Sequence, residues 1–442
     1  MLLALVATVS CSTNVPSVVA NAQLVSPQSA QRTQDADEFC RVVAVHYAYF
    51  DLKKTDWSRV CVSLRADAAL AEDRTAFVGL LERALGELYD PHAHLSTSTR
   101  ASPRIIPTHT DVWAVWRGDA AVIDEVRTDS AAFRAGVRAG MTMLEVDDAP
   151  IDALVRARAP RFLREADPAA RDWALQSVLA GRQNQQPMRL RVAQAGQTHV
   201  LSFNPDRPQS ASLLSQRRIG TGGAGGAGGD IGVIRINNAL GEAALVGAFD
   251  DALAAVNDTQ ALVLDLRDTP SGGNSSVARG IMGRLVATEA AYQRHEAIGE
   301  FRATGVRRVW TESVLPRGDV WRKPVVVLVG RWTGSMGEGI AIGLHAARAA
   351  PILGSLMAKL LGAIDAFRLP HSGIVVRIPT EKLFTPDGTP RESFVPCAPR
   401  QQPASSDAGV SDALMNSAVI ALRHALNPTS ANTPVPASLL CE

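Results

Sequence analysis

One stretch of the chain, residues 323–338, predicts a β-strand that turns sharply into an α-helix. Residues 325–329 are all Val or Leu, the pattern of a strand that is buried on both faces of a sheet. Small apolar residues begin a helix a few positions later, so Ser335 falls at the corner between the two elements. The free N–H groups and the dipole of a helix N-terminus favour negative charge. Ser335 is therefore either a simple N-cap or a nucleophile placed where the oxyanion of its tetrahedral intermediate is stabilised.

Strand and helix patterns alternate through residues 230–400. Such alternation predicts a mostly parallel sheet with helices packed on it. Further strands are expected at residues 231–236, 261–266, 352–354 and 373–378, and helices at 243–256, 280–287 and 339–350. A C-terminal helix, predicted at 410–426, and a tail make up residues 410–442.

The N-terminal part is helical in pattern, and residues 37–98 predict a small helical domain. Its last loop holds His92 and His94, because Pro91 interrupts the helix just before them. The loop is either a cap with a hydrogen-bonded histidine or a source of imidazole for chemistry. No third ligand with a recognisable spacing accompanies the two histidines, so we predict no metal site. The polar residues 23–35 are expected to be flexible.

The middle of the chain, residues 105–205, has strand patterns and one short helix. Residues 130–148 resemble the helix, glycine turn and strand of a PDZ domain, with Met141 and Asp148 in place of the usual Asp and Gly. A helical insertion follows at 152–186. PDZ grooves bind chain ends by strand addition, although such a groove can also be empty or covered. Residues 220–229 predict a flexible Gly-rich linker.

The N-terminus and the cysteines predict export. Residues 1–22 read as a signal peptide, and Cys11 lies in a weak lipoprotein motif. We therefore expect a protein of the periplasm or cell envelope, either free or as a lipoprotein. The four cysteines other than Cys11 form either two disulfides or four buried thiols. The simplest disulfide pairing is Cys40–Cys61 and Cys397–Cys441.

Composition excludes two other classes of protein. Hydrophobic residues make up 46% of the chain and charged residues 20%, which is typical of a globular protein rather than a disordered one. The net charge is +1, so nothing favours a nucleic-acid partner. A membrane tether is expected only through lipidation of Cys11.

Three segments together resemble one family, the C-terminal-processing (tail-specific) serine peptidases with their tricorn-core and retinoid-binding relatives. The segments are residues 262–273, 330–338 and 388–392, which are similar to the family's L-D-L-R-x-N-x-G-G, G-x-x-T-A-S-A-x-E and G-x-P-x-E patterns. The resemblance implies a multidomain α/β fold. Its parts are a helical N-terminal domain, a PDZ-like β-rich domain and a crotonase-like α/β peptidase core at residues 230–400.

The resemblance also implies site residues. Ser335 is the implied nucleophile, and the N–H group of Met336 with that of Gly272 or Gly273 is expected to form the oxyanion hole. One branch of the family uses a histidine base, which here is His92, together with Glu392. Glu392 can instead be the partner of Arg391 in a structural ion pair.

The other branch of the family uses a lysine base. The lysine here is Lys359, one residue before the family's position, which Leu360 occupies. A slip of one residue in extended backbone turns a side chain to the opposite face. We therefore prefer His92 as the base.

The predicted function is that of an exported serine endopeptidase that forms an acyl-enzyme on Ser335 and needs no cofactor. Its partners are expected to be protein or peptide substrates, with chain ends held by the PDZ-like domain. The alternatives are an inactive binding protein on the same scaffold, a PDZ-based scaffold that delivers partners, and a Ser335–Lys359 dyad peptidase.

Overall fold

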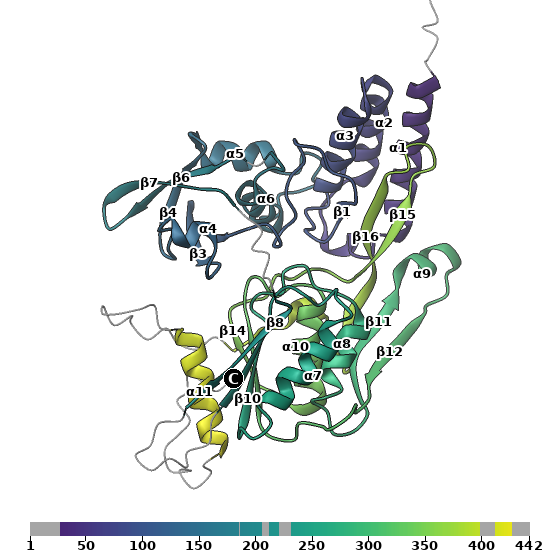
Figure 1. The fold of residues 1–442 in the computed structure, drawn as a ribbon. Coiled ribbons are helices and arrows are strands. Elements are labelled where there is room, and N and C mark those ends of the chain that lie inside the picture. The colour runs from purple at the N-terminus through teal and green to yellow at the C-terminus, as the bar shows by residue number, and fades with distance from the viewer. Residues whose placement is uncertain (1–26, 185, 206–211, 221–230, 398–411, 427–442) are drawn as a thin grey trace, which may run out of the picture.

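The computed structural model describes residues 27–184, 186–205, 212–220, 231–397 and 412–426. Across these ranges the chain is a mixed α/β, multidomain protein with several sheets (Figure 1). The predicted signal segment, Cys11, Cys441 and residues 221–229 of the predicted linker lie outside them. No helix of the described part is long and apolar enough to span a membrane.

The central sheet has the strand order β14-β13-β10-β9-β8. Its parallel strands are β9 (Ile231–Ile236), β10 (Ala261–Asp265), β13 (Val325–Val329) and β14 (Ile352–Gly354). The expected parallel sheet is therefore present, but the strand predicted at 373–378 is not in it, because those residues lie at the start of β16 (Val375–Phe384) in another sheet. The antiparallel edge strand β8 (Leu214–Ile219) was not predicted.

Helices cover both faces of this sheet, as a doubly buried strand requires. In β13, the side chains of Val325, Val327 and Val329 pack with α7 (Leu245–Ala255), α8 (Ser275–Met282) and α10 (Met336–Arg348). The alternate side chains, Val326 and Leu328, pack against α11 (Ala413–Leu426) on the other face. Fully burying each such side chain stabilises the fold by about 1.5–3 kcal/mol.

A second sheet joins the N-terminal helices to the C-terminal half of the chain. Its order is β1-β16-β11-β12, with β15 also paired to β16. The strands are β1 (His94–Leu95), β11 (Ala290–Ala297), β12 (Val309–Val314), β15 (Ala363–Arg368) and β16 (Val375–Phe384), and α9 (Ile298–Thr304) follows β11. Helices α1 (Pro27–His46), α2 (Trp57–Leu70) and α3 (Arg74–Gly86) share one apolar core with residues of β16. Between α1 and α2 lies the short 3-10 helix η1 (Phe50–Leu52).

Two details of the N-terminal helices bear on the sequence predictions. Cys40 and Cys61 form a disulfide that joins α1 to α2, as the simplest pairing predicts. The expectation of a flexible segment was wrong for residues 27–35, because α1 begins at Pro27, and residues 23–26 lie outside the described ranges. The buried carboxylate of Asp35 accepts the N–H groups of His371 and Ser372, which fastens α1 to the turn between β15 and β16.

The third sheet has six strands in the order β2-β3-β4-β6-β7, with β5 paired to β4. The strands are β2 (Val112–Arg117), β3 (Ala120–Val126), β4 (Thr142–Val146), β5 (Ala149–Pro150), β6 (Met188–Gln194) and β7 (Gln197–Phe203). The short helix α4 (Ala131–Arg134) precedes β4, and the predicted helical insertion forms α5 (Ile151–Arg158) and α6 (Pro168–Ala180). The PDZ assignment of this domain stays a prediction.

Candidate active site

Ser335 lies where the sequence places it, at the turn between β13 and α10. It is the N-cap of α10 and has a φ of 51°, which is uncommon for a residue other than glycine. Its side chain is half-buried. Met336 is the first residue of the helix. Among the described residues, no hydrogen-bond acceptor faces its N–H group, so this donor is available for an oxyanion.

The loop after β10 lies against this turn. Thr269 accepts the Gly334 N–H at 3.2 Å and donates its own N–H to Trp332 O at 2.9 Å. Asn238 holds the other side of the loop through both polar atoms of its side chain, which contact Ser271. Two loops that are far apart in the sequence therefore form one rigid unit around Ser335.

Gly272 of this loop lies directly beside Ser335. It has a φ of +62°, and a Cβ atom added to it would lie 2.4 Å from Ser335 Cβ, 2.9 Å from Oγ and 3.0 Å from the Met336 N atom. Only a glycine therefore fits beside the serine without displacing it.

The two glycines predicted as oxyanion donors differ in their hydrogen bonds. The Gly272 N–H donates to Thr269 O at 3.1 Å, so it is not free to bind an oxyanion. In the described part of the chain the Gly273 N–H has no such acceptor. Gly273 instead packs its backbone against Leu240 O, which a Cβ atom would overlap. The geometry favours Gly273 and Met336 as the donor pair and gives Gly272 a steric role.

Glu338 is the principal residue that the sequence predictions missed. Its buried carboxylate accepts three backbone N–H groups, from Ser335 at 3.0 Å, Lys359 at 2.8 Å and Leu360 at 3.1 Å. The guanidinium of Arg391 lies 3.8 Å away. Burial raises the pKa of Glu338 to about 7, against the lowering effect of Arg391 and the N–H donors. The Ser-x-x-Glu spacing of a capping box was the available signal.

His92 reaches the same region from the N-terminal domain. The ring is buried, and its Nδ1 atom lies 2.6 Å from the backbone oxygen of Leu361, the neighbour of Leu360. Because a carbonyl oxygen only accepts, Nδ1 carries the hydrogen in the neutral ring and Nε2 keeps its lone pair. Burial lowers the pKa of His92 to about 4, so the ring is neutral at pH 7. No hydrogen bond joins it to Ser335 Oγ within the described ranges.

The loop around His92 is fixed by a second buried carboxylate. Asp90 accepts the His92 N–H at 2.9 Å and the Tyr47 hydroxyl at 2.8 Å. The next histidine, His94, places its Nδ1 atom 3.0 Å from His92 O and begins β1, which pairs with β16. The backbone position of His92 is thus held from both sides.

Among the described residues no hydrogen bond joins Glu392 to His92, and the role of Glu392 in the triad stays a prediction. The ring nitrogen that a carboxylate would face is occupied by Leu361 O. Glu392 lies half-buried in the 3-10 helix η2 (Arg391–Ser393). Burial raises the pKa of Tyr49, and the charge of Glu392 raises it further. Arg391 reaches Glu338 and donates to Leu360 O at 2.9 Å.

Lys359 is exposed, as expected for a residue one position out of register. Its backbone has a φ of 56° and its N–H bonds to Glu338. The Leu360 side chain takes the inner place, since its Cδ1 atom would lie 3.0 Å from a Cβ atom added to Gly334. In the part of the chain that is described, no cluster of His, Cys, Asp and Glu side chains could hold a metal ion.

Two ion pairs connect the six-stranded domain to the loops of the site. Arg127, which follows β3, contacts Asp268 in the loop after β10 at 2.5 Å. Arg331, in the turn between β13 and α10, contacts Asp124 of β3 at 2.7 Å. Both pairs are largely buried, so the orientation of this domain and the geometry of both loops are mechanically linked.

The Gly272→Ala variant should lose the reactivity of Ser335, because the new methyl group displaces the serine and the Met336 N–H group. We expect at least about a hundredfold slower labelling of Ser335 by a fluorophosphonate, the scale of a lost oxyanion donor. Gly118→Ala is the matched control, since Gly118 has the same φ of +62° with nothing within 4 Å of an added Cβ atom. Equal labelling rates in the two variants would refute the steric role.

Replacing Glu338 by alanine should leave three backbone N–H groups without their acceptor. We expect the free energy of unfolding to fall by about 1–3 kcal/mol and fluorophosphonate labelling to slow at least tenfold. Glu87→Ala is the control, because Glu87 is also buried and accepts two backbone N–H groups, from Arg161 and Phe162. The Glu87→Ala variant should lose stability but keep its rate of Ser335 labelling. Equal labelling rates in the Glu338→Ala and Glu87→Ala variants would contradict the role of Glu338 in holding the site.

Comparison with known proteins shows solved structures that share this fold. Among solved structures, the chain resembles mature CPAF complexed with lactacystin, with 15% identity and a TM-score of 0.59 over 84% of this chain and 93% of that one. It also resembles a photosystem II D1 C-terminal processing protease, with 17% identity and a TM-score of 0.55 over 83% and 92% of the two chains. At these identities the likeness shows a shared fold.

One region of the chain also matches a family model by sequence. No curated protein sequence matches the chain at a significant level, but residues 230–395 match the family model of peptidase family S41. This range contains Ser335, Gly272, Gly273 and Glu338. The predicted resemblance to the C-terminal-processing peptidases is therefore confirmed: the chain carries a peptidase family S41 domain and is a serine-type peptidase.

Proposed function

We propose that the protein is an exported serine endopeptidase in which Ser335 is the nucleophile and His92 the general base. The observation that carries the proposal is the fit of Gly272 against Ser335 and the Met336 N atom. A glycine held this close to a serine at a helix N-terminus leaves a small, donor-lined space beside the hydroxyl. That space suits the oxyanion of a tetrahedral intermediate.

The proposed reaction proceeds through an acyl-enzyme. Ser335 Oγ attacks the carbonyl carbon of a peptide bond and passes its proton to His92 Nε2, while the N–H groups of Met336 and Gly273 bind the oxyanion. The histidinium then protonates the leaving amine. Water, deprotonated by the same ring, hydrolyses the ester to free Ser335 and the carboxylate product.

Two observations favour His92 over Lys359 as the base. The Nδ1–H of His92 is bonded to Leu361 O, so the neutral ring presents an unprotonated Nε2. Lys359 is exposed to water, whereas a lysine base requires a desolvated ammonium group. Hydrogen bonds between catalytic groups are often long without substrate and tighten when it binds, so we propose that Nε2 comes within hydrogen-bonding reach of Oγ in the substrate complex.

Export to the periplasm or cell envelope is proposed on the predicted signal segment, with the Cys40–Cys61 disulfide in support because disulfides persist in oxidising compartments. Lipidation of Cys11 would tether the protein. The proposed substrates are proteins or peptides, and chain ends are proposed to bind the six-stranded, PDZ-like domain.

Substitution of the three candidate residues tests the mechanism. Ser335→Ala should abolish cleavage of a casein substrate. His92→Ala should reduce kcat/KM at least about a hundredfold, the scale of a lost general base. Lys359→Ala should change it less than about twofold, and His345→Ala is the folded control, because its Nδ1 also faces a backbone oxygen, that of Ala350, at the far end of α10.

Three outcomes would overturn parts of the proposal. Cleavage by folded Ser335→Ala would exclude this nucleophile. An active His92→Ala with an inactive Lys359→Ala would assign a Ser–Lys dyad and leave the His92 loop as a structural cap. Absence of both cleavage and fluorophosphonate labelling in the wild type would favour an inactive binding protein on the same scaffold.

A further inference from the structure

Helix α10, which begins beside Ser335, packs against β11 of the second sheet (Figure 1). The contact is close, because a Cβ atom added to Gly343 of the helix would lie 3.1 Å from the Cβ atom of Tyr292. Next to Tyr292 begins a cluster of buried and half-buried polar side chains that the proposed reaction does not use. Its members are Gln293 and His295 of β11, Glu312 of β12, Glu381 of β16 and Arg279 of α8.

His295 lies at the centre of this cluster, with a carboxylate near each ring nitrogen. Its Nδ1 atom is 2.8 Å from Glu381 Oε2, and its Nε2 atom is 3.8 Å from Glu312 Oε2. The ring is buried and stacks on the ring of Trp310, with 4.8 Å between the centroids. Because an ionised carboxylate only accepts hydrogen bonds, Glu381 keeps a hydrogen on Nδ1. Protonation of the ring therefore adds the second hydrogen at Nε2.

The charged groups around His295 favour its protonated form. Burial lowers the pKa of the ring, but the hydrogen bonds and charges of Glu312 and Glu381 raise it by more, so that it lies above its ordinary value. The nearby cations contact other members of the cluster: Arg279 pairs with Glu312 at 3.3 Å, and Arg308 lies over the Trp310 ring. No ionisable side chain of α10 acts on the ring. His295 thus loses its charge as the pH rises above about 6.5.

Gln293 connects this ring to α10. Its Nε2 atom lies 2.9 Å from His295 Nε2 and donates to Glu312 Oε2 at 3.1 Å. Its Oε1 atom is buried, and no donor in the described part of the chain faces it. This oxygen lies against the first turn of α10, 3.6 Å from the place that a Cβ atom would take on Gly339. The Met336 side chain lies at the same glycine, with its Sδ atom 3.7 Å from that place.

The hydrogen bonds of Gln293 suit only a neutral His295. With Nε2 unprotonated, the ring accepts an N–H of the Gln293 amide. Once Nε2 carries a hydrogen, two donors face each other, and the amide must rotate by half a turn so that its oxygen accepts from the ring. The NH2 group then faces the first turn of α10 in place of the oxygen. Glu312 keeps the Tyr292 hydroxyl and Arg279 as donors in this arrangement.

We propose that Gln293 is a positioning residue for the oxyanion hole and that protonation of His295 sets the orientation of its amide. With His295 charged, the NH2 group of Gln293 faces the turn that carries the Met336 N–H, and its partial positive charge favours an oxyanion there. With His295 neutral, the carbonyl oxygen faces the same turn and opposes the oxyanion. The inference rests on the proposed roles of Ser335 and Met336.

The rate of fluorophosphonate labelling of Ser335, measured against pH in the full-length chain, tests the proposal. The rate should rise with pH through the pKa of His92, about 4. It should then fall about two- to fivefold as His295 loses its charge, the scale of a dipole that acts at a helix N-terminus. His295→Gln should keep the rise and lose the fall, because glutamine does not titrate.

A second variant, Gln293→Met, separates the amide from a general effect of the His295 charge. Methionine has a similar length and no amide dipole, so the fall in labelling should disappear. NMR of the same chain labelled with ¹⁵N-histidine should still show His295 titrating. A fall that persists in Gln293→Met would assign it to the charge of His295 itself and overturn the role of Gln293. A wild-type rate that stays constant while His295 titrates would overturn the proposal as well.

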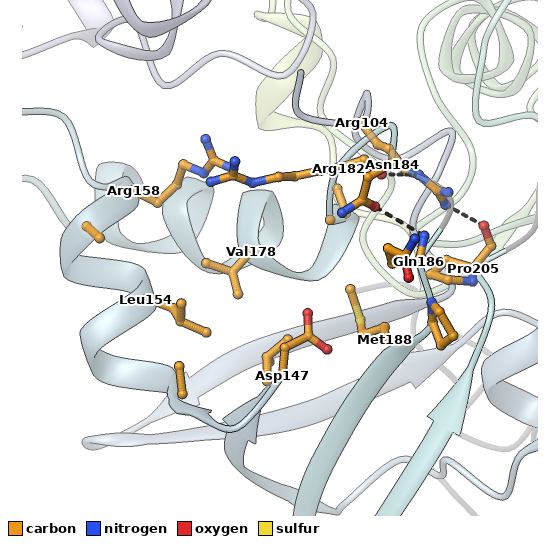
Figure 2. A pocket seen from close by; sticks show the side chains of 16 residues that line it. Arg104, Asp147, Leu154, Arg158, Val178, Arg182, Asn184, Gln186, Met188 and Pro205 are labelled. Carbon is orange, nitrogen blue, oxygen red and sulfur yellow. Dashed lines mark hydrogen bonds between the residues drawn. The ribbon is translucent and has the colours of Figure 1, made fainter. Parts of the chain in front are cut away.

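Gln176→Met is the matched control. Gln176 is also buried, and its Oε1 atom faces no donor among the described residues. It lies on α6, whose Val178 lines a pocket of about 510 Å³ in the six-stranded domain (Figure 2). That pocket shares no residue with the loops around Ser335. Gln176→Met should therefore keep both the rise and the fall, and loss of the fall in this variant would contradict the proposal.

One further readout separates this proposal from the peptidase function. The ¹⁵N signal of the Gln293 side-chain amide should shift with the same pKa as the His295 ring, whether or not Ser335 reacts. A chain that is labelled and cleaves casein, while the Gln293 signal ignores the titration of His295, refutes the positioning role alone. A chain that is neither labelled nor active, while the two signals titrate together, refutes the peptidase function and retains the coupling of Gln293 to His295.

Discussion

The candidate site depends on one buried carboxylate, that of Glu338. Three backbone N–H groups from two segments donate to it, and Arg391 lies at 3.8 Å. A buried acid in such surroundings is expensive to leave unpaired, so the turn at Ser335 and the segment at 359–360 are held at fixed positions relative to each other. The carbonyl oxygen that fixes the ring of His92 belongs to the next residue, Leu361. The same carboxylate therefore fixes the positions of both Ser335, the proposed nucleophile, and the segment that contacts His92, the proposed base.

The remaining architecture brings the N-terminal helices to that segment. Helices α1, α2 and α3 share a core with Leu361 and with residues of β16, while β1 adds directly to β16. The loop that carries His92 therefore folds against the C-terminal half of the chain, far away in sequence. The six-stranded domain is attached through the buried pairs Arg127–Asp268 and Arg331–Asp124. Rearrangement of either attachment would change the geometry around Ser335.

Much of the central sheet could be predicted from the sequence, because strands buried on both faces are continuous apolar runs. The predicted strands 325–329 and 231–236 coincide with β13 and β9. Strands β8, β11, β12 and β15 were missed. In β8 and β12 exposed polar residues leave only a weak alternating pattern, and these strands are recognised only when their partners are known.

The site was predictable where side chains carry the chemistry and not where the backbone does. Ser335, Gly272 and His92 were singled out by residue type, spacing and family resemblance. The hydrogen-bond partner of His92 Nδ1 is the main-chain oxygen of Leu361, which no residue pattern reveals. Gly272 and Gly273 look equivalent in sequence, yet only the fold shows that Thr269 O already accepts the N–H of Gly272.

The most direct test of the mechanism is an NMR titration of His92 in chain labelled with ¹⁵N-histidine, with the signal assigned by comparison with His92→Gln. The structure predicts a neutral ring with hydrogen on Nδ1 at pH 7 and a pKa of about 4. As the pH falls through that value, Nε2 takes up a proton and can no longer accept one from Ser335. A ring that carries its hydrogen on Nε2, or titrates near the ordinary value of about 6.5, would contradict the assignment of His92 as the buried base.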